Sequence, residues 1–151
     1  MTRAYDEAYL GKARTVLARM LDFAVYDLKY DIEKFFQLFI FSGVANLFES
    51  GDCRTLVGMS GVELAYEVLE RAEIEHQRVE PQFTINRSEE YWAGWALAYY
   101  QWFTALSFVE IMRFASIKDV VNLYSPFHEM DIQQFVDRMN EMRDMRTEAG
   151  A

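Results

Sequence analysis

The stretch that decides the fold is residues 89–109, which read EEYWAGWALAYYQWFTALSFV. It contains three Trp and three Tyr, and no charged residue falls between Glu90 and Glu110. A helix that is apolar on nearly every side lies at the centre of a core or continues into an interface. The sequence therefore predicts a central aromatic helix. The residues that recur on one side at helical spacing, with the tryptophans expected in the core, are Trp92, Trp95, Tyr99 and Trp102.

The same stretch is just long enough to cross a bilayer, which takes about 20 residues. Its polarity argues against that interpretation. Tyr99, Tyr100 and Gln101 lower the hydropathy, and Ser107 with Glu110 looks like the start of a new helix. We therefore expect a helix buried by protein and no association with a membrane.

The composition indicates one domain with apolar surface to spare. A chain of 151 residues buries a full core without disulfides or metals. Its hydrophobic share of 52% and aromatic share of 16% exceed what a monomer of this size easily hides. A protein partner is the expected cover, and a second copy of the chain in a homodimer is the alternative.

The charge and the cysteine content indicate which class of partner and which cellular compartment to expect. The net charge of −9 and pI near 4.7 disfavour nucleic-acid binding by this chain alone, because phosphate contacts need clustered Lys and Arg. An acidic chain is better matched to a basic protein partner. The single Cys53 and the lack of a charged-then-apolar leader favour the cytoplasm.

Apolar periodicity predicts three helices before residue 77. The first covers residues 5–28 and has one broad apolar face. The second is capped by Asp31 and continues to Ser50, although its apolar run at residues 35–41 also fits a buried strand. After a glycine-rich loop at residues 51–61, Ser60 and Glu63 form a capping box for a third helix that ends near His76.

The rest of the chain predicts a loop and four more helices. Residues 77–87 have no helical period, contain Pro81 and include a short extended arm at residues 79–85, so they are the best candidate for a mobile or binding loop. Ser88 begins the aromatic helix, and capping patterns at Ser107 and Ser116 begin two short helices that end near Tyr124. A last amphipathic helix follows Ser125-Pro126. The fold class is all-α, with about seven helices in a single domain over residues 1–151.

Patterns that would support catalysis or metal binding are weak. Glu73 and His76 form one Glu-x-x-His pair, but a di-metal site needs a second pair. Ser125, His128 and Asp131 are close in sequence, which is not a triad geometry. Cys53 has no identifiable base beside it. We therefore expect no enzymatic activity, no metal and no cofactor.

Surface aromatic residues are the best candidates for a binding site, because Trp and Tyr are hot-spot types at protein interfaces. A base-stacking platform is disfavoured, since residues 88–110 contain no Lys or Arg. The candidate partner- or ligand-binding residues are Tyr91, Trp95, Tyr99, Trp102, His128 and Glu129.

The motif EYWAGWALAYYQW at residues 90–102 resembles the E-Y-W-x-G-W-x-L-A-Y-Y-Q-W signature of an uncharacterised family of bacterial all-helical proteins. Further similar blocks, LFIFSG at 38–43, GMSG at 58–61, SF and EI within 107–111, and LY at 123–124 with His128, Glu129 and Asp131, extend the resemblance over most of residues 5–140. The chain departs from the family at Ala105-Leu106, where Gly-Arg is common.

The resemblance implies a regulatory context. Members of this family often continue into a C-terminal helix-turn-helix of the phage-repressor type, and many are encoded beside toxin–antitoxin-like genes. Residues 145–150 are similar to the opening of that DNA-binding module, so residues 145–151 would be its truncated start.

Taken with the aromatic excess and the acidity, the resemblance favours a non-enzymatic interaction domain, antitoxin-like or regulatory, whose partner is a protein such as a toxin encoded nearby. A small-molecule sensor domain of a truncated transcriptional regulator is the alternative, and a helical metalloenzyme around Glu73 and His76 is third.

Overall fold

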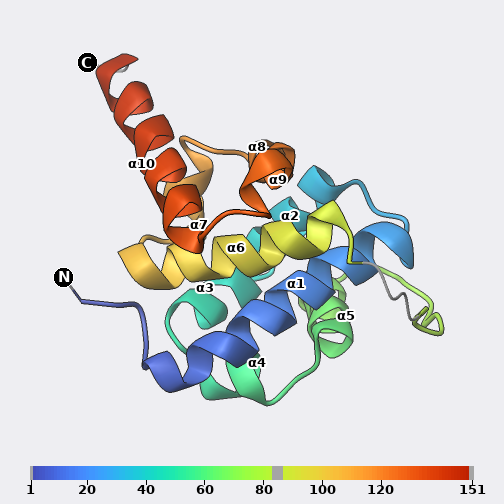
Figure 1. The fold of residues 1–151 in the computed structure, drawn as a ribbon. Coiled ribbons are helices and arrows are strands. Elements are labelled where there is room, and N and C mark those ends of the chain that lie inside the picture. Colours follow the sequence, from blue (N-terminus) through green and yellow to red (C-terminus); the bar gives the residue numbers. More distant parts are fainter. Residues whose placement is uncertain (1, 83–86, 150–151) are drawn as a thin grey trace.

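The computed structural model describes residues 2–82 and 87–149, and every regular element within them is helical (Figure 1). The all-α prediction is confirmed, and the helices form one compact domain. In these two described ranges, a 3-10 turn at Glu7–Tyr9 precedes ten α-helices: α1 (Leu10–Tyr26), α2 (Ile32–Phe41), α3 (Val44–Glu49), α4 (Cys53–Val57), α5 (Gly61–Arg71), α6 (Glu89–Thr104), α7 (Phe108–Met112), α8 (Ile117–Asn122), α9 (Tyr124–Phe127) and α10 (Ile132–Ala149).

Side-chain caps fix where the helices begin, as the sequence predicts. The side chains of Ser60, Ser107 and Ser116 each accept a hydrogen bond from the backbone N–H three residues later. The carboxylate at that later position accepts one from the backbone N–H of the serine. Asp31 caps α2 and Ser88 caps α6 in the same way, without the return bond. Each cap satisfies N–H groups that have no partner within their own helix.

The described residues contain ten α-helices where the sequence predicted about seven, because single residues break the expected elements. Gly43 has φ 87°, which ends α2 and starts α3 inside the helix expected to continue to Ser50. The glycine-rich loop encloses α4, capped by Asp52. The buried-strand alternative for residues 35–41 is wrong, since they lie in α2.

One further boundary differs from the prediction. The third helix ends at Arg71 rather than near His76, because Glu73 adopts φ 58°. The aromatic helix ends at Thr104, where Ala105 adopts φ 60°, which agrees with the new helix predicted from Ser107. The extended arm predicted for residues 79–85 falls partly outside the described residues. Val79 itself is held by an N–H bond of 2.9 Å to the Tyr66 hydroxyl.

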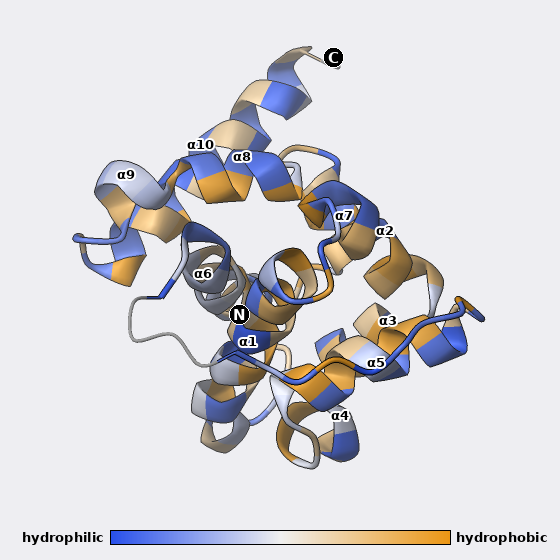
Figure 2. Cartoon of the chain, turned by 90° about the vertical axis from the view of Figure 1, so that its right-hand side faces the viewer, coloured by the Kyte–Doolittle hydropathy of each residue, from blue (hydrophilic) through white to orange (hydrophobic). Residues whose placement is uncertain are grey.

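The centre of the domain is a pair of helices, α1 and α6, rather than α6 alone. They lie against each other along most of their length, with α5, α4 and α2 on the other sides of α1 and α8, α9 and α10 on the other sides of α6 (Figures 1 and 2). Gly94 makes this approach possible, since a Cβ there would lie 2.7 Å from the Ala18 Cα and 2.8 Å from the Leu17 carbonyl oxygen.

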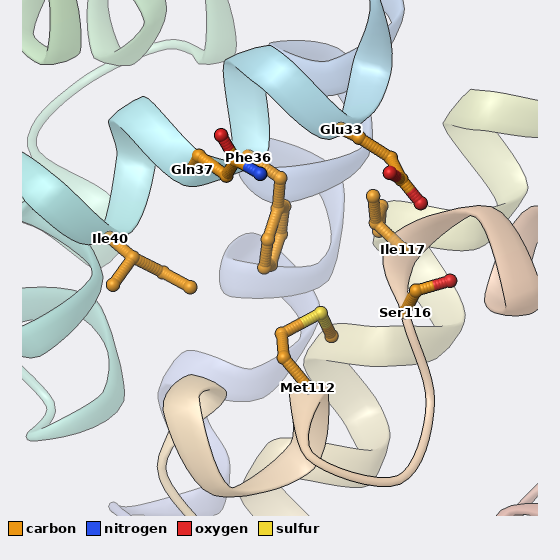
Figure 3. Close-up of a pocket in the computed structure, with 7 residues that line it drawn as sticks. All are labelled: Glu33, Phe36, Gln37, Ile40, Met112, Ser116 and Ile117. Carbon is orange, nitrogen blue, oxygen red and sulfur yellow. The ribbon is translucent and has the colours of Figure 1, made fainter.

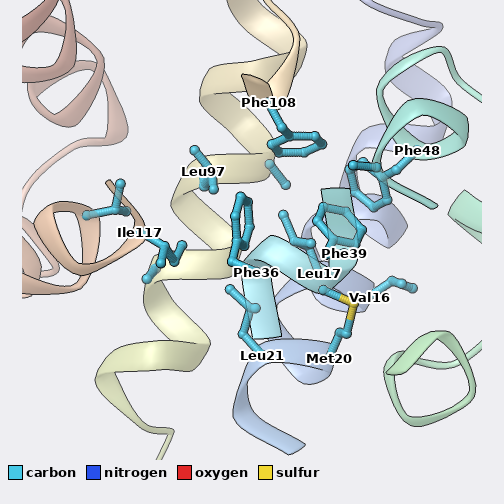
Figure 4. Close-up of a cluster of buried hydrophobic side chains, with 14 of the residues drawn as sticks. Val16, Leu17, Met20, Leu21, Phe36, Phe39, Phe48, Leu97, Phe108 and Ile117 are labelled. Carbon is cyan, nitrogen blue, oxygen red and sulfur yellow. The ribbon is translucent and has the colours of Figure 1, made fainter. Parts of the chain in front are cut away.

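A cluster of phenylalanine rings joins this pair to the rest of the fold (Figure 4). Phe108, which is fully buried, stands 5.9 Å from Phe36, 5.3 Å from Phe39 and 5.7 Å from Phe48, measured between ring centroids. The edge-to-face and tilted geometries are those that aromatic pairs prefer. One residue of α7 thereby connects α2 and α3.

Glu49 is a half-buried carboxylate beside this cluster, and it predicts a pH effect. Its side chain accepts the Phe108 N–H at 3.2 Å, yet burial raises its pKa above the ordinary 4.5. Because folding raises this pKa, the protonated Glu49 side chain adds to the free energy of unfolding below pH 4.5. This contribution is lost as the pH rises through the pKa of the folded state.

We therefore expect Glu49→Gln, which stays uncharged, to have a larger free energy of unfolding than wild type at neutral pH. The advantage should vanish below about pH 4. Urea unfolding at several pH values measures this. Glu63→Gln is the matched control. Because hydrogen bonds from Ser60 lower the pKa of Glu63, this variant should have a smaller free energy of unfolding than wild type at neutral pH. An advantage of Glu49→Gln that does not change with pH would contradict the prediction.

Candidate functional site

The outer side of α6 carries a row of partly exposed aromatic side chains. They recur at every fourth position, which places them on one face of the helix, and we call them the aromatic row: Tyr91, Trp95, Tyr99 and Phe103. The opposite side of α6 is buried against α1 and the helices around it. One helix thus has a structural face and a surface face.

Arginines from outside α6 cover the aromatic row. The Arg14 guanidinium carbon lies 3.3 Å from the Trp95 ring centroid and 4.9 Å from that of Tyr99. Arg87 lies 4.7 Å from Tyr91 by the same measure. A guanidinium within about 6 Å of a ring face is attracted by its quadrupole. These contacts were not predicted, because the two arginines lie outside residues 88–110, the stretch that contains no Lys or Arg. The one indication of the Arg14 contact is its position on α1, one helical turn before Ala18, which is buried.

Arg14 is held in place rather than free to turn toward a ligand. Its Nε donates to the Trp95 carbonyl oxygen at 3.2 Å, and burial lowers its pKa to about 10. Within the described residues, its Nη2 and the nearby Tyr5 hydroxyl are buried without a hydrogen-bond partner. Burial also raises the pKa of Tyr5. The middle of the row is therefore a fixed cation–aromatic stack.

The row opens into a pocket of about 230 Å³ at the start of α6. We call it the aromatic pocket, and the residues that line it are Arg87, Ser88, Tyr91, Trp92, Trp95, Tyr124 and His128. The Tyr124 and His128 rings stack at 3.8 Å with 4° between their planes, and Trp92 meets the Tyr124 ring at 5.9 Å. The pocket thus has aromatic walls from α6 and from the segment around α9.

Polar bonds fix the pocket walls. His128 Nδ1 lies 2.6 Å from the Tyr124 carbonyl oxygen, which orients the imidazole ring. Ser88 caps α6 and also donates from its hydroxyl to Asp22, which pairs with Arg19 at 2.9 Å. These bonds hold the pocket walls in place without a ligand, so binding would require little rearrangement.

The structure gathers three of the six sequence-predicted binding residues in this pocket, namely Tyr91, Trp95 and His128. Glu129 lies beside it, with its Oε1 3.6 Å from His128 Nε2. Tyr99 lies one turn further along the row.

Trp102 has a structural setting instead. It is buried, and its Nε1 donates to the Tyr5 carbonyl oxygen at 2.8 Å. The core placement predicted for Trp92 and Trp102 is confirmed. Trp95 is only partly buried: it packs against the edge of the core, and the Arg14 guanidinium lies over its ring.

The catalytic and metal patterns do not assemble in the described residues. Glu73 and His76 lie beyond the end of α5, so they do not share a helical face. His76 instead stacks on Tyr66 at 5.5 Å. His128 and Asp131 make separate local bonds, and no three His, Cys, Asp or Glu side chains among residues 2–82 and 87–149 gather as metal ligands would.

A second apolar hollow, of about 180 Å³, lies between α2 and the α7–α8 segment (Figure 3). Phe36, Ile40, Met112 and Ile117 line it, with Glu33, Gln37 and Ser116 at its edges. Phe41, at the end of α2, has 78% of its surface exposed. This hollow is the main competitor of the aromatic pocket as a docking site.

Fold and site together define an all-helical domain with a preformed aromatic pocket on its surface. Among the described helices, none combines the length and the hydropathy needed to cross a bilayer. The chain has no match among protein-family models, curated proteins or solved structures.

Proposed function

We propose that this chain is a non-enzymatic interaction domain, antitoxin-like or regulatory, that binds a partner protein at the aromatic pocket. The observation that carries the proposal is the pocket itself, which is open, preformed and walled by Tyr91, Trp92, Trp95 and Tyr124. Pockets lined by Trp, Tyr and Arg are where protein interfaces concentrate their binding energy.

The size and charge of the pocket favour one anchoring side chain of a protein. Its 230 Å³ is below the range of about 300–1,000 Å³ that is usual for small-molecule sites. Acidic residues follow directly on the residues that line it, as Glu89 after Ser88 and Glu129 after His128. We infer an apolar or aromatic anchor flanked by Lys or Arg, which agrees with the net charge of −9.

The family resemblance adds a candidate for this partner. It implies a gene neighbourhood of toxin–antitoxin type, so a product encoded nearby is the first protein to test, and a second copy of the chain is the next. The similarity of residues 145–150 to a helix-turn-helix start is of sequence only, since residues up to Ala149 continue α10. We propose no duplex binding by this chain and a cytoplasmic location.

A small-molecule sensor is the second candidate function. It is favoured by the polar groups that converge on the aromatic walls, namely the Arg87 guanidinium and the imidazole of His128. These would orient a small aromatic acid. An aromatic metabolite found by mass spectrometry in the purified protein, and absent from Trp95→Ala, would favour this function over protein binding.

Photo-crosslinking tests the docking site. We expect a benzoylphenylalanine in place of Tyr91 to crosslink to the co-expressed product of a neighbouring gene, because that side chain lines the aromatic pocket. The matched control carries the same probe in place of Phe41, which is 78% exposed and lies on α2. Crosslinking from position 41 alone would place the docking site at the end of α2 instead of at the aromatic pocket.

A further inference from the structure

A groove of about 360 Å³ lies between α7 and the last turns of α10, away from the aromatic pocket. Figure 1 shows that this end of α10 extends beyond the body of the domain. Besides Thr147, the groove is lined by three arginines, one glutamate and two apolar side chains: Arg113, Arg143, Arg146, Glu110, Leu106 and Phe114. Its volume falls in the range of small-molecule sites, about 300–1,000 Å³.

The three arginines have no described carboxylate as an ion-pair partner. Arg143 is flanked three and four residues away on α10 by Met139, Asn140, Arg146 and Thr147, none of which is acidic. Arg138, on the same helix, shows the usual arrangement, with Glu141 at 3.1 Å. In a chain of net charge −9, which has 24 acidic residues, three arginines without such a pair in one groove are unexpected.

The single carboxylate in the groove does not neutralise them. Glu110 accepts the Ser107 N–H at 3.1 Å as part of the α7 capping box. Hydrogen bonds from Ser107 and then the charges of Arg113 and Arg143 lower its pKa, so it stays ionised. Three guanidinium groups against one carboxylate leave the groove with an excess of positive charge, which an anion would balance.

We propose that this groove binds a phosphate monoester carried on an apolar or aromatic group. A phosphate presents three oxygens to several guanidinium forks at once, whereas one carboxylate is matched by a single fork. Leu106 and Phe114, both partly exposed, supply the apolar wall for the organic group. The site is independent of the aromatic pocket, with which it shares no residue.

Calorimetric titration with phenyl phosphate at about 20 mM salt tests the site, since low salt leaves the charge interactions unscreened. We expect saturable binding to wild type, weaker binding of inorganic phosphate, and a loss of about tenfold or more in Arg143→Gln and Arg146→Gln. Both arginines are exposed, so the variants should fold normally. Arg138→Gln, on the same helix but outside the groove, is the control and should bind like wild type.

Three results would overturn the proposal. One is no saturable binding of phenyl phosphate. A second is equal loss in Arg138→Gln and Arg143→Gln, which would indicate unspecific attraction. The third is tighter binding of a tetra-aspartate peptide than of phenyl phosphate, because the groove would then be a surface for acidic protein segments.

Discussion

Replacing Gly94 with valine is expected to prevent the domain from folding. The missing Cβ of Gly94 would lie 2.7 Å from the Ala18 Cα and 2.9 Å from its backbone nitrogen, and these are backbone atoms that cannot turn aside. Overpacking usually costs about 1–3 kcal/mol where side chains can shift. Here α1 and α6 must separate, so we expect a loss above that range, a large part of the 5–15 kcal/mol typical of a domain.

Soluble expression and urea unfolding measure this effect. Gly94→Ala should unfold at a lower urea concentration than wild type, and Gly94→Val should be insoluble or unfolded. Gly11→Ala is the matched control, because Gly11 is an exposed residue of α1 with nothing within 4 Å of its missing Cβ. That variant should gain up to about 1 kcal/mol from helix propensity. A Gly94→Val protein as stable as wild type would show that α1 and α6 do not approach this closely.

Phe108→Ala should cost about 3–5 kcal/mol, the usual penalty for a large cavity in a core. Phe108 is fully buried and contacts the rings of Phe36, Phe39 and Phe48, so its removal leaves an empty space among three helices. The expected result is a lower midpoint in urea, with an unchanged slope, because the folded state stays compact.

Phe41→Ala is the control for the phenylalanine cluster. Its side chain is 78% exposed, so the free energy of unfolding should change by less than about 0.5 kcal/mol. Equal losses in the two variants would contradict the packing described for the cluster.

Local signals predicted the parts of the fold that depend on neighbouring residues. The capping boxes at Ser60, Ser107 and Ser116 were predicted and are present, because each needs only two side chains three residues apart. The helix breaks at Gly43 and Glu73 were not predicted. A positive φ at these positions depends on the tertiary path of the chain. Gly and Glu are also found inside helices in general, so the residue type alone does not predict a break.

The candidate site was predicted only in part, because its geometry depends on contacts between residues far apart in the chain. The sequence made Tyr91, Trp95 and His128 candidate binding residues, but their position in one pocket depends on α9 folding back onto the start of α6. The arginine cover of the aromatic row depends on Arg14, 81 positions before Trp95 in the chain. No spacing rule within α6 could have revealed it. Trp95 was expected in the core because helical periodicity does not show which sides of a helix have neighbours.

The division of α6 into two faces connects fold and function. Its inner face, with Gly94 against α1, accounts for stability, and its outer face carries the aromatic row. Under the proposed function, truncating Tyr91, the member of the row that lines the pocket without packing on the core cluster, should therefore reduce binding without unfolding the protein.

The most direct test measures the free energy of partner binding and the melting temperature on the same variants. Binding is measured by titration with the partner that crosslinking identifies, and stability by thermal unfolding. The account predicts that Tyr91→Ala weakens partner binding by about 2 kcal/mol or more while its melting temperature stays close to that of wild type. Phe41→Ala should bind and melt like wild type. If Tyr91→Ala binds normally and Phe41→Ala does not, the aromatic pocket is not the docking site.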